Sequence, residues 1–178
     1  MSSGEDTATK DWQEQILPTL KGFDIRHVVY VPDAGHSAAI HAAEQDKDII
    51  SLPLTSEEEG IGYLAGAWLG GERGALLLQS SGVGNCINTL ALNACAKFPL
   101  LMLVTMRGDW AEFNAWQNPM GQATKRALEM MGVRTWRADR EDDVIPLLHG
   151  AATMAFNGDA ACALILGQRL IGEKKWVK

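Results

Sequence analysis

The chain has 178 residues, 47% hydrophobic and 21% charged, which is typical of one globular domain with a sizeable core. Its formal net charge of −6 argues against nucleic acid as a partner, because phosphate backbones are held by clustered lysines and arginines. The three cysteines have no paired spacing and no apolar run is long enough to cross a membrane, so we expect a cytoplasmic protein with a disordered tail at residues 1–10.

Short apolar runs alternate with longer amphipathic segments, which predicts strands alternating with helices. In chain order we expect a helix from Trp12 to Leu20 that ends at Gly22, a strand at 26–32, a helix at 36–45, a strand at 48–54, a helix that Thr55 or Ser56 caps, a strand at 74–81, a helix at 85–97 and a strand at 99–106. After an irregular piece from Arg107 to Pro119, we expect a helix at Gln122–Met131, a strand at 133–138, a helix at Asp142–Phe156 and a strand at 161–167. The strands are mostly apolar on both faces, so the fold class is α/β: a doubly wound, six-stranded, mostly parallel sheet with helices on both faces.

Polar and glycine-rich segments follow several of the predicted strands. In open parallel sheets, ligands bind beyond the carboxyl ends of the strands, where the loops lead into helices. Four such segments are "VPDAGHS" (31–37), "LTSEEEG" (54–60), "QSSGVGN" (79–85) and "TMRGDWAEFNAWQNPMG" (105–121). We therefore expect the functional site at this one edge of the sheet.

The segment "QSSGVGN" has the glycines of a phosphate-binding loop, but not the rest of one. A dinucleotide fingerprint would need glycine in place of Ile87 and a later acid, and a nucleoside triphosphate loop would need Gly-Lys-Ser or Gly-Lys-Thr; both patterns are absent. The glycines can instead let the backbone approach a flat ligand or another subunit, or simply form a tight turn. Ser80 and Ser81 lack the Gly-x-Ser-x-Gly frame of a hydrolase nucleophile.

The four histidines show no metal-ligand spacing with one another or with the cysteines, so no metal site is predicted on this chain. His27 and His149 are interpreted as structural or solvated. His36 lies in the first of the four edge segments and is therefore the histidine that we consider for the site.

Three consecutive glutamates begin the helix that follows Ser56. Carboxylates at a helix start are stabilised by the helix dipole by about 0.3 to 1 kcal/mol each, and this accounts for two of the three. Helical spacing places Glu57 and Glu58 on different faces of the expected helix. Glu57 shares an apolar stripe with Ile61 and Leu64, whereas Glu58 does not. A carboxylate drawn into apolar surroundings can exchange protons near neutral pH, but periodicity alone does not choose between Glu57 and Glu58.

Glu58 lies instead above a row of glycines, Gly62, Gly66 and Gly70. A helix face without side chains lets another backbone approach closely. We therefore expect an interface with a second chain along this face.

Taken together, these segments resemble the pyrimidine-binding domain of thiamin diphosphate-dependent enzymes. The matching pieces are "VVYVPDAG", "SEEEGIGYLAGAWLGG" and "GALLLQSSGVGNCINTLALNACAKFPLLMLVTMRG", which lie in order between Phe23 and Gly108. The pattern is most similar to the alpha subunits of the sulfopyruvate and phosphonopyruvate decarboxylase family. The resemblance implies a single domain of the pyrimidine-binding type over residues 11–178.

The resemblance also implies which residues hold the cofactor. The family carries an acidic residue nine positions before the glycine of the "AG" pair, here Gly66, and this position is Glu57. Its implied role is a hydrogen bond to a ring nitrogen of the cofactor's pyrimidine, which makes Glu57 catalytic and leaves Glu58 as a helix-start charge. Further cofactor contacts are implied for Gln79, Ser80, Gly82, Gly84 and Asn85.

By the same resemblance, the substrate enters near Asp33, Gly35 and His36 and near the 107–121 loop. Pyruvate decarboxylases carry a histidine pair in that loop where this chain has Gln117 and Asn118, which argues against pyruvate or an aromatic substrate. Asp33 or His36 could then supply a proton, and Arg107 could hold a sulfonate or phosphonate by forked hydrogen bonds.

The family binds the diphosphate through Mg²⁺, held by a Gly-Asp-Gly motif and a later Asn on a separate domain, and this chain lacks that frame. The resemblance therefore implies a beta subunit that carries the diphosphate and Mg²⁺ site, in a hetero-oligomer with two or more of each chain.

The implied function is the alpha subunit of a two-chain, thiamin diphosphate-dependent decarboxylase that converts a short anionic 2-oxo acid to the aldehyde and CO2. Two alternatives remain at this point. One is the pyrimidine-binding subunit of a carboligase or oxoacid oxidoreductase, and the other is a non-catalytic partner module.

Overall fold

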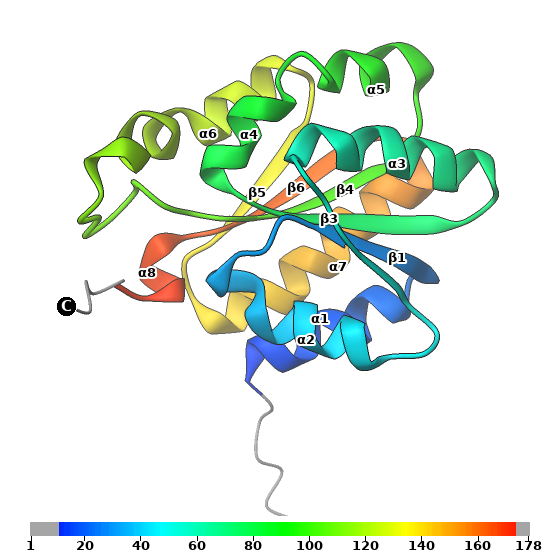
Figure 1. Ribbon diagram of the computed structural model, residues 1–178, viewed down its shortest axis with the longest axis horizontal. Helices are drawn as coiled ribbons and strands as arrows, with labels where there is room; N and C mark the ends of the chain where they lie inside the picture. The colour runs from blue at the N-terminus through cyan, green and yellow to red at the C-terminus, as the bar shows by residue number, and fades with distance from the viewer. Residues whose placement is uncertain (1–10, 174–178) are drawn as a thin grey trace, which may run out of the picture.

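The computed structural model describes residues 11–173, so the tail predicted at residues 1–10 lies outside the described residues. Its centre is a six-stranded sheet in the order β2-β1-β3-β4-β6-β5, and all five pairings among these strands are parallel (Figure 1). The strands are Ile25–Tyr30 (β1), Ile50–Pro53 (β2), Arg73–Gln79 (β3), Leu100–Thr105 (β4), Arg134–Ala138 (β5) and Ala161–Leu166 (β6). The predicted six-stranded α/β fold is confirmed, and the sheet is wholly parallel.

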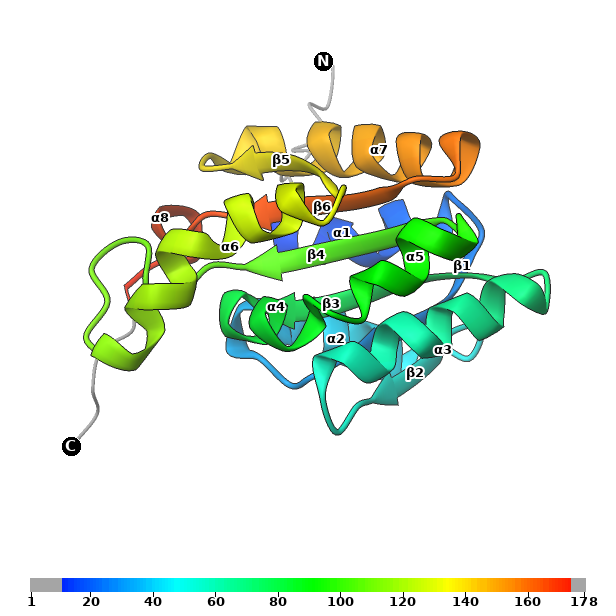
Figure 2. The same cartoon turned by 90° about the horizontal axis from the view of Figure 1, so that it is seen from above.

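Helices cover both faces of the sheet, as a parallel arrangement requires. They are Trp12–Lys21 (α1), Ser37–Gln45 (α2), Glu57–Leu69 (α3), Ser80–Cys86 (α4), Leu90–Ala96 (α5), Asn118–Met130 (α6), Glu141–Gly158 (α7) and Gln168–Ile171 (α8), with 3-10 turns at Ala34–His36 (η1) and Ala115–Gln117 (η2). Helices α1, α2 and α7 lie on one face, and α3 to α6 lie on the other (Figures 1 and 2). Among residues 11–173 no helix has the length and apolarity needed to cross a membrane.

The central strands supply side chains to two separate cores. In β3, Ala75 and Leu77 pack in the layer of α1, α2 and α7, whereas Leu76 and Leu78 pack in the layer of α3 and α4. All four are fully buried, and burying a leucine of this kind contributes roughly 1.5 to 3 kcal/mol. This two-sided burial fixes the strands, and because all of their pairings are parallel, their carboxyl ends lie at one edge.

The helix predicted at 85–97 is wrong in its boundaries. Helix α4 begins directly after β3, at Ser80, and a turn at residues 87–89 separates it from α5. Asn88 and β-branched Thr89 are weak helix formers, which favours a break there. The predicted "QSSGVGN" loop is consequently the first two turns of a helix, entered straight from a strand.

Two further boundaries differ from the prediction at the carboxyl edge. Helix α6 begins at Asn118 rather than Gln122, because Pro119 fits the first turn of a helix, where its missing N–H is not needed. The short helix α8 was not predicted, since four residues are too few to show a period.

Candidate active site

Glu57 is the first residue of α3 and is only 8% exposed. It lies on the buried side of the helix with Ile61 and Leu64, as the helical spacing predicts. The side-chain amide of Asn85 on α4 donates to its Oε2 atom at 2.8 Å. Asn85 thereby orients the carboxylate and leaves Oε1 as the oxygen available to a ligand.

Gly82 makes this position of Glu57 possible. A Cβ atom at Gly82 would overlap the carboxylate of Glu57, closer than real carbon atoms approach. The absence of a side chain lets α4 pass directly against the start of α3. Glu57, Gly82 and Asn85 therefore form one group, which we call the Glu57 group.

The two neighbouring glutamates remain at the helix start, where each interacts with the residues just before the helix. The backbone N–H of Thr55 donates to Glu59 at 2.9 Å, and the hydroxyl of Ser56 donates to Glu58. The Ser56 hydrogen bond lowers the pKa of Glu58, which keeps this carboxylate charged. The prediction that Thr55 or Ser56 caps the helix by accepting is wrong, because here the carboxylates accept.

The glycine row of α3 faces outward. Gly62, Gly66 and Gly70 are exposed, and a Cβ atom at Gly62 or Gly66 would meet nothing within 4 Å. The row is thus open to another chain, and the interface there stays a prediction.

Asp33 joins the carboxyl ends of the three strands β1, β3 and β4. One carboxylate oxygen accepts from Gln79 Nε2 at 2.8 Å, and the other accepts from Thr105 Oγ1 at 2.7 Å and from the N–H of Gly35 at 3.0 Å. Burial raises the pKa of Asp33, but hydrogen bonds from Thr105 and Gln79, the nearby His36 and the Gly35 N–H together hold it below its ordinary value. Asp33 is therefore a charged acceptor at neutral pH, which does not suit a proton donor.

His36 lies beneath this cluster rather than on its surface. Its ring is 1% exposed, and Nε2 lies 3.0 Å from the carbonyl oxygen of Leu103 and 3.3 Å from that of Leu78. Burial lowers its pKa, so the ring is neutral at pH 7 and Nε2–H donates to these carbonyls, while Nδ1 is buried with no hydrogen-bond partner among the described residues. His36 pins the start of α2 to the sheet, and its burial gives no support to the predicted contact with substrate.

Ser80 is also turned inward. Its hydroxyl donates to the carbonyl of Arg107 at 3.1 Å and accepts from the N–H of Arg107 at 3.0 Å. The side chain is fully buried and both of its hydrogen-bonding roles are used. Ser80 therefore fixes the segment after β4 to α4, and this geometry gives no support to the predicted cofactor contact.

Arg107 differs most from its predicted use. Its Nε and Nη2 atoms donate to the two carboxylate oxygens of Glu112 at 2.6 and 2.5 Å, and the side chains are 12% and 3% exposed. The hydrogen bonds from Arg107 lower the pKa of Glu112 to about 2. The forked hydrogen bonds predicted for a substrate anion are thus made to the chain's own carboxylate.

Gln168 and Glu112 complete this loop, and the sequence analysis missed both. Gln168 Oε1 accepts from the N–H groups of Asp109 and Trp110 at 2.9 Å each, and its Nε2 donates to Glu112 at 2.9 Å. Gln168 lies two residues beyond the end of β6, after Gly167, so a polar residue near a strand's carboxyl end was the available signal. For Glu112, five residues beyond Arg107 in an irregular segment, no spacing rule gives a signal.

Gln117 and Asn118 lie where the loop enters α6. Gly108, at φ 70°, packs so closely on the backbone of these two residues that a Cβ atom there would overlap the Gln117 carbonyl. The side-chain oxygen of Gln117 is buried with no partner among the described residues, whereas Asn118 is exposed.

The carboxyl edge therefore brings together two of the predicted groups: the Glu57 group and the Asp33 cluster with Gln79. In the Glu57 group, one carboxylate oxygen accepts from Asn85 and the other accepts no hydrogen bond from the described residues. In the Asp33 cluster, the hydrogen bonds from Gln79 and Thr105 join the ends of three strands, and the bond from the Gly35 N–H is local.

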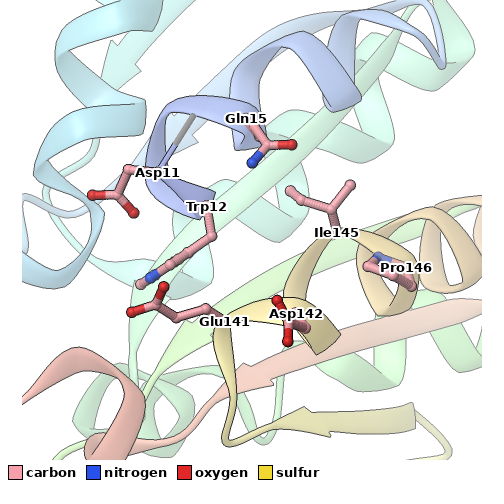
Figure 3. Close-up of a pocket in the computed structure, with 7 residues that line it drawn as sticks. All are labelled: Asp11, Trp12, Gln15, Glu141, Asp142, Ile145 and Pro146. Atoms are coloured by element: carbon pink, nitrogen blue, oxygen red, sulfur yellow. The ribbon is translucent and has the colours of Figure 1, made fainter. Parts of the chain in front are cut away.

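A separate hollow of about 340 Å³ lies between α1 and α7, in the other helical layer (Figure 3). Figure 3 shows Glu141 directed toward the ring of Trp12, with Ile145 and Pro146 further along α7. Since Glu57 belongs to the α3 layer, this hollow is not part of the Glu57 group.

Comparison with known families gives a match over most of the chain. The family described as "Thiamine pyrophosphate enzyme, N-terminal TPP binding domain" matches residues 10–136. This range contains every residue that the sequence analysis assigned to the site, from Asp33 to Asn118.

Curated relatives and a solved structure agree with this match. The chain is 36% identical to the sulfopyruvate decarboxylase subunit alpha of Methanococcus maripaludis, over 86% of this chain and 92% of that one. It is 32% identical to the phosphonopyruvate decarboxylase of Streptomyces viridochromogenes, over 86% of this chain and 37% of that one. In fold it is similar to the 2-oxoglutarate:ferredoxin oxidoreductase from Magnetococcus marinus, with a TM-score of 0.67 and 11% identity over 90% of this chain and 29% of that chain.

Proposed function

Because this chain belongs to the thiamine pyrophosphate enzymes, whose N-terminal TPP binding domain it carries, we propose that it is the alpha subunit of a two-chain decarboxylase. Its substrate is a short anionic 2-oxo acid of the sulfopyruvate or phosphonopyruvate type, and the products are the aldehyde and CO2. Support comes from three relatives named sulfopyruvate decarboxylase subunit alpha, which are 33 to 37% identical to this chain.

One observation carries the proposal: the Glu57 group fits the pyrimidine end of thiamin diphosphate. A buried carboxylate with one oxygen fixed by Asn85 and the other open can hydrogen-bond a ring nitrogen. Gly82 lets the carboxylate pack directly against α4, at a position from which any larger residue would displace it. Gly84 and Asn85 are exposed on the same helix, so a ligand can reach them, and we keep both as proposed cofactor contacts.

When bound, the cofactor supplies the electron sink that decarboxylation of a 2-oxo acid requires. The chain's own contribution is to place the Glu57 carboxylate and to hold or release a proton at its Oε1 atom. Helices α3 and α4 are locked by burial of Ile61, Leu64 and Val83, so this oxygen is held in place before a ligand arrives.

Around this group, we propose that Asp33 and Gln79 brace the edge on which substrate binds, and that His36 and Ser80 support it from below. Arg107 is already paired with Glu112, so we do not assign it the substrate's anionic group. Asn118 and the backbone at Gly35 remain proposed substrate contacts on this chain.

We also propose that a beta subunit supplies the diphosphate and Mg²⁺ site, in a hetero-oligomer with two or more copies of each chain. The printed names "subunit alpha" among the relatives support a second chain. The three cysteines are all free, which is in keeping with our further proposal of a cytoplasmic location.

The test mixes the chain with the product of a neighbouring reading frame that encodes Gly-Asp-Gly followed by Asn, together with Mg²⁺ and thiamin diphosphate. Release of CO2 is measured from sulfopyruvate, phosphonopyruvate and pyruvate. We expect release to be fastest from one of the first two. No release from any of the three would overturn the decarboxylase, and fastest release from pyruvate would overturn the substrate class.

A further inference from the structure

The segment that leads into α6 presents large apolar side chains to solvent. Trp116 is 86% exposed, Phe113 47% and Trp110 45%, and a hollow of about 530 Å³ lies among Ala115, Trp116, Pro119 and Met120. We call these six residues the aromatic patch. Large exposed apolar patches of this kind mark interaction sites, because burying them against a partner is favourable.

The backbone under the aromatic patch is already fixed. Gln168 holds the N–H groups of Asp109 and Trp110, and Glu112 holds those of Gly108 and Asn114 at 3.2 and 3.0 Å. A surface fixed in advance loses little conformational entropy on association. The exposed rings are therefore presented by a rigid frame.

The charges beside the aromatic patch are paired within the chain. Arg107 is bound to Glu112, and Arg137 is bound to Asp109 at 2.5 Å. The guanidinium of Arg107 also lies 5.6 Å from the centre of the Phe113 ring. An apolar centre bordered by internally neutralised charge is typical of the core of a protein–protein interface.

The aromatic patch is continuous with the Glu57 group. Met120 of the aromatic patch lies 3.4 Å, measured from its sulfur, from the position that a Cβ atom on Gly84 would take. Gly84 immediately precedes Asn85, whose amide holds Glu57. Helices α4 and α6 pack side by side, and the segment before α6 extends past the carboxyl edge of the sheet (Figures 1 and 2). A chain that covers the Glu57 group thus lies next to the aromatic patch at Met120.

We propose that the aromatic patch is the docking surface for the beta subunit, with Trp116 as its anchor. This inference rests on the proposed function, because the occupant is the chain that completes the cofactor site. The aromatic patch adjoins the Glu57 group, and the proposed cofactor site there lacks the part that holds the diphosphate. This favours the beta subunit, which would supply that part, over a second copy of this chain. Tryptophan is among the residues that most often dominate binding energy at interfaces.

The experiment measures the dissociation constant of the alpha–beta pair by titration, with Mg²⁺ and thiamin diphosphate present, for the unaltered chain, Trp116→Ala and Met130→Ala. Met130 is the matched control, because it is 73% exposed at the other end of α6. We expect Trp116→Ala to weaken the pair at least 30-fold and Met130→Ala to change it less than 3-fold. Turnover at saturating beta subunit is measured as well, because an anchor is revealed by a loss of affinity, whereas a substrate contact is revealed by a loss of turnover alone.

Several results would overturn the inference. A dissociation constant for Trp116→Ala within 3-fold of that of the unaltered chain would show that Trp116 is not the anchor. That result would not affect the proposed decarboxylase function. A loss of turnover in the saturated pair without a loss of affinity would assign Trp116 to the substrate site instead. Sedimentation of the alpha chain alone that shows a dimer broken by Trp116→Ala would give the aromatic patch to a second copy. Failure of the unaltered chains to form a pair would remove both this inference and the proposed function.

Discussion

Two glutamates at the carboxyl edge of the sheet have buried carboxylates, and the chain treats them in opposite ways. Glu112 accepts two hydrogen bonds from Arg107, two from the N–H groups of Gly108 and Asn114, and one from Gln168. Glu57 accepts one from Asn85 and faces a glycine. The first carboxylate is saturated and holds a loop, whereas the Oε1 atom of the second accepts no hydrogen bond from the described residues, and we propose that it serves a ligand.

This difference shows that burial of a carboxylate does not by itself identify a reactive group. What separates the two is the number of donors around each carboxylate, because each donor stabilises the charged form and occupies a lone pair. Variants of the two carboxylates and of their neighbours test this distinction.

Removing the saturated carboxylate should cost stability. Glu112→Ala leaves the buried Arg107 guanidinium without its counter-charge, so we expect the free energy of unfolding to fall by about 3 to 5 kcal/mol. The control is Glu129→Ala, an exposed carboxylate 3.8 Å from Lys125, which should cost less than about 1 kcal/mol. Urea unfolding of the two variants measures the difference. Equal losses would show that Glu112 is no more than a surface charge.

The same pair predicts a dependence of stability on pH. The pKa of Glu112 is about 2 in the folded chain because Arg107 donates to it, against an ordinary value of 4.5. A lowered folded-state pKa adds stability that is complete above about pH 4.5 and is lost as pH falls toward 2, here about 3 kcal/mol. The free energy of unfolding of the unaltered chain, measured from pH 6 to 2.5, should therefore fall more steeply than that of Glu112→Gln. Parallel curves would contradict the assignment.

Filling the space beside the open carboxylate should impair function instead. In Gly82→Ala the new methyl group must displace Glu57, so we expect CO2 release by the reconstituted pair to fall about 10- to 100-fold. Gly150→Ala is the control, because a Cβ atom there meets nothing within 4 Å and lies in α7 on the other helical layer. A Gly82→Ala pair with the turnover of the control would show that the contact with Glu57 is unimportant.

The smallest effect is expected from the neighbouring helix-start charge. Glu59→Ala removes the acceptor of the Thr55 N–H and a charge near the positive end of α3, and it should lower the free energy of unfolding by about 0.5 to 1 kcal/mol. Thermal unfolding of the variant measures this. A loss above about 2 kcal/mol would mean that Glu59 does more than stabilise the helix start.

Much of the fold could be predicted from the sequence. Apolar runs predicted the six strands, because strands buried on both faces are mostly apolar, as β4 is from Leu100 to Val104. Spacing along α3 placed Glu57 on the stripe of Ile61 and Leu64, the family resemblance chose it over Glu58, and the structure buries Glu57.

The internal pairing of the edge could not be predicted in the same way. Arg107 had the right charge for an anion, but its partner Glu112 is brought to it by an irregular loop that has no period. Ser80 and His36 lie in the segments that were predicted to form the site, but both side chains point inward. The direction of each side chain depends on where the neighbouring helix begins, and α4 begins at Ser80 itself. Periodicity shows which face of an element is buried, whereas hydrogen bonds between loops require coordinates.

The central claim is that Glu57, and not its neighbour, serves the cofactor in a site completed by a second chain. The most direct measurement compares CO2 release by saturated alpha–beta pairs that carry Glu57→Gln or Glu58→Gln, with the unfolding of each alpha chain as a control. We expect Glu57→Gln to reduce turnover at least 100-fold and Glu58→Gln less than 3-fold, with both chains folded. Near-normal turnover of the Glu57→Gln pair would contradict the account.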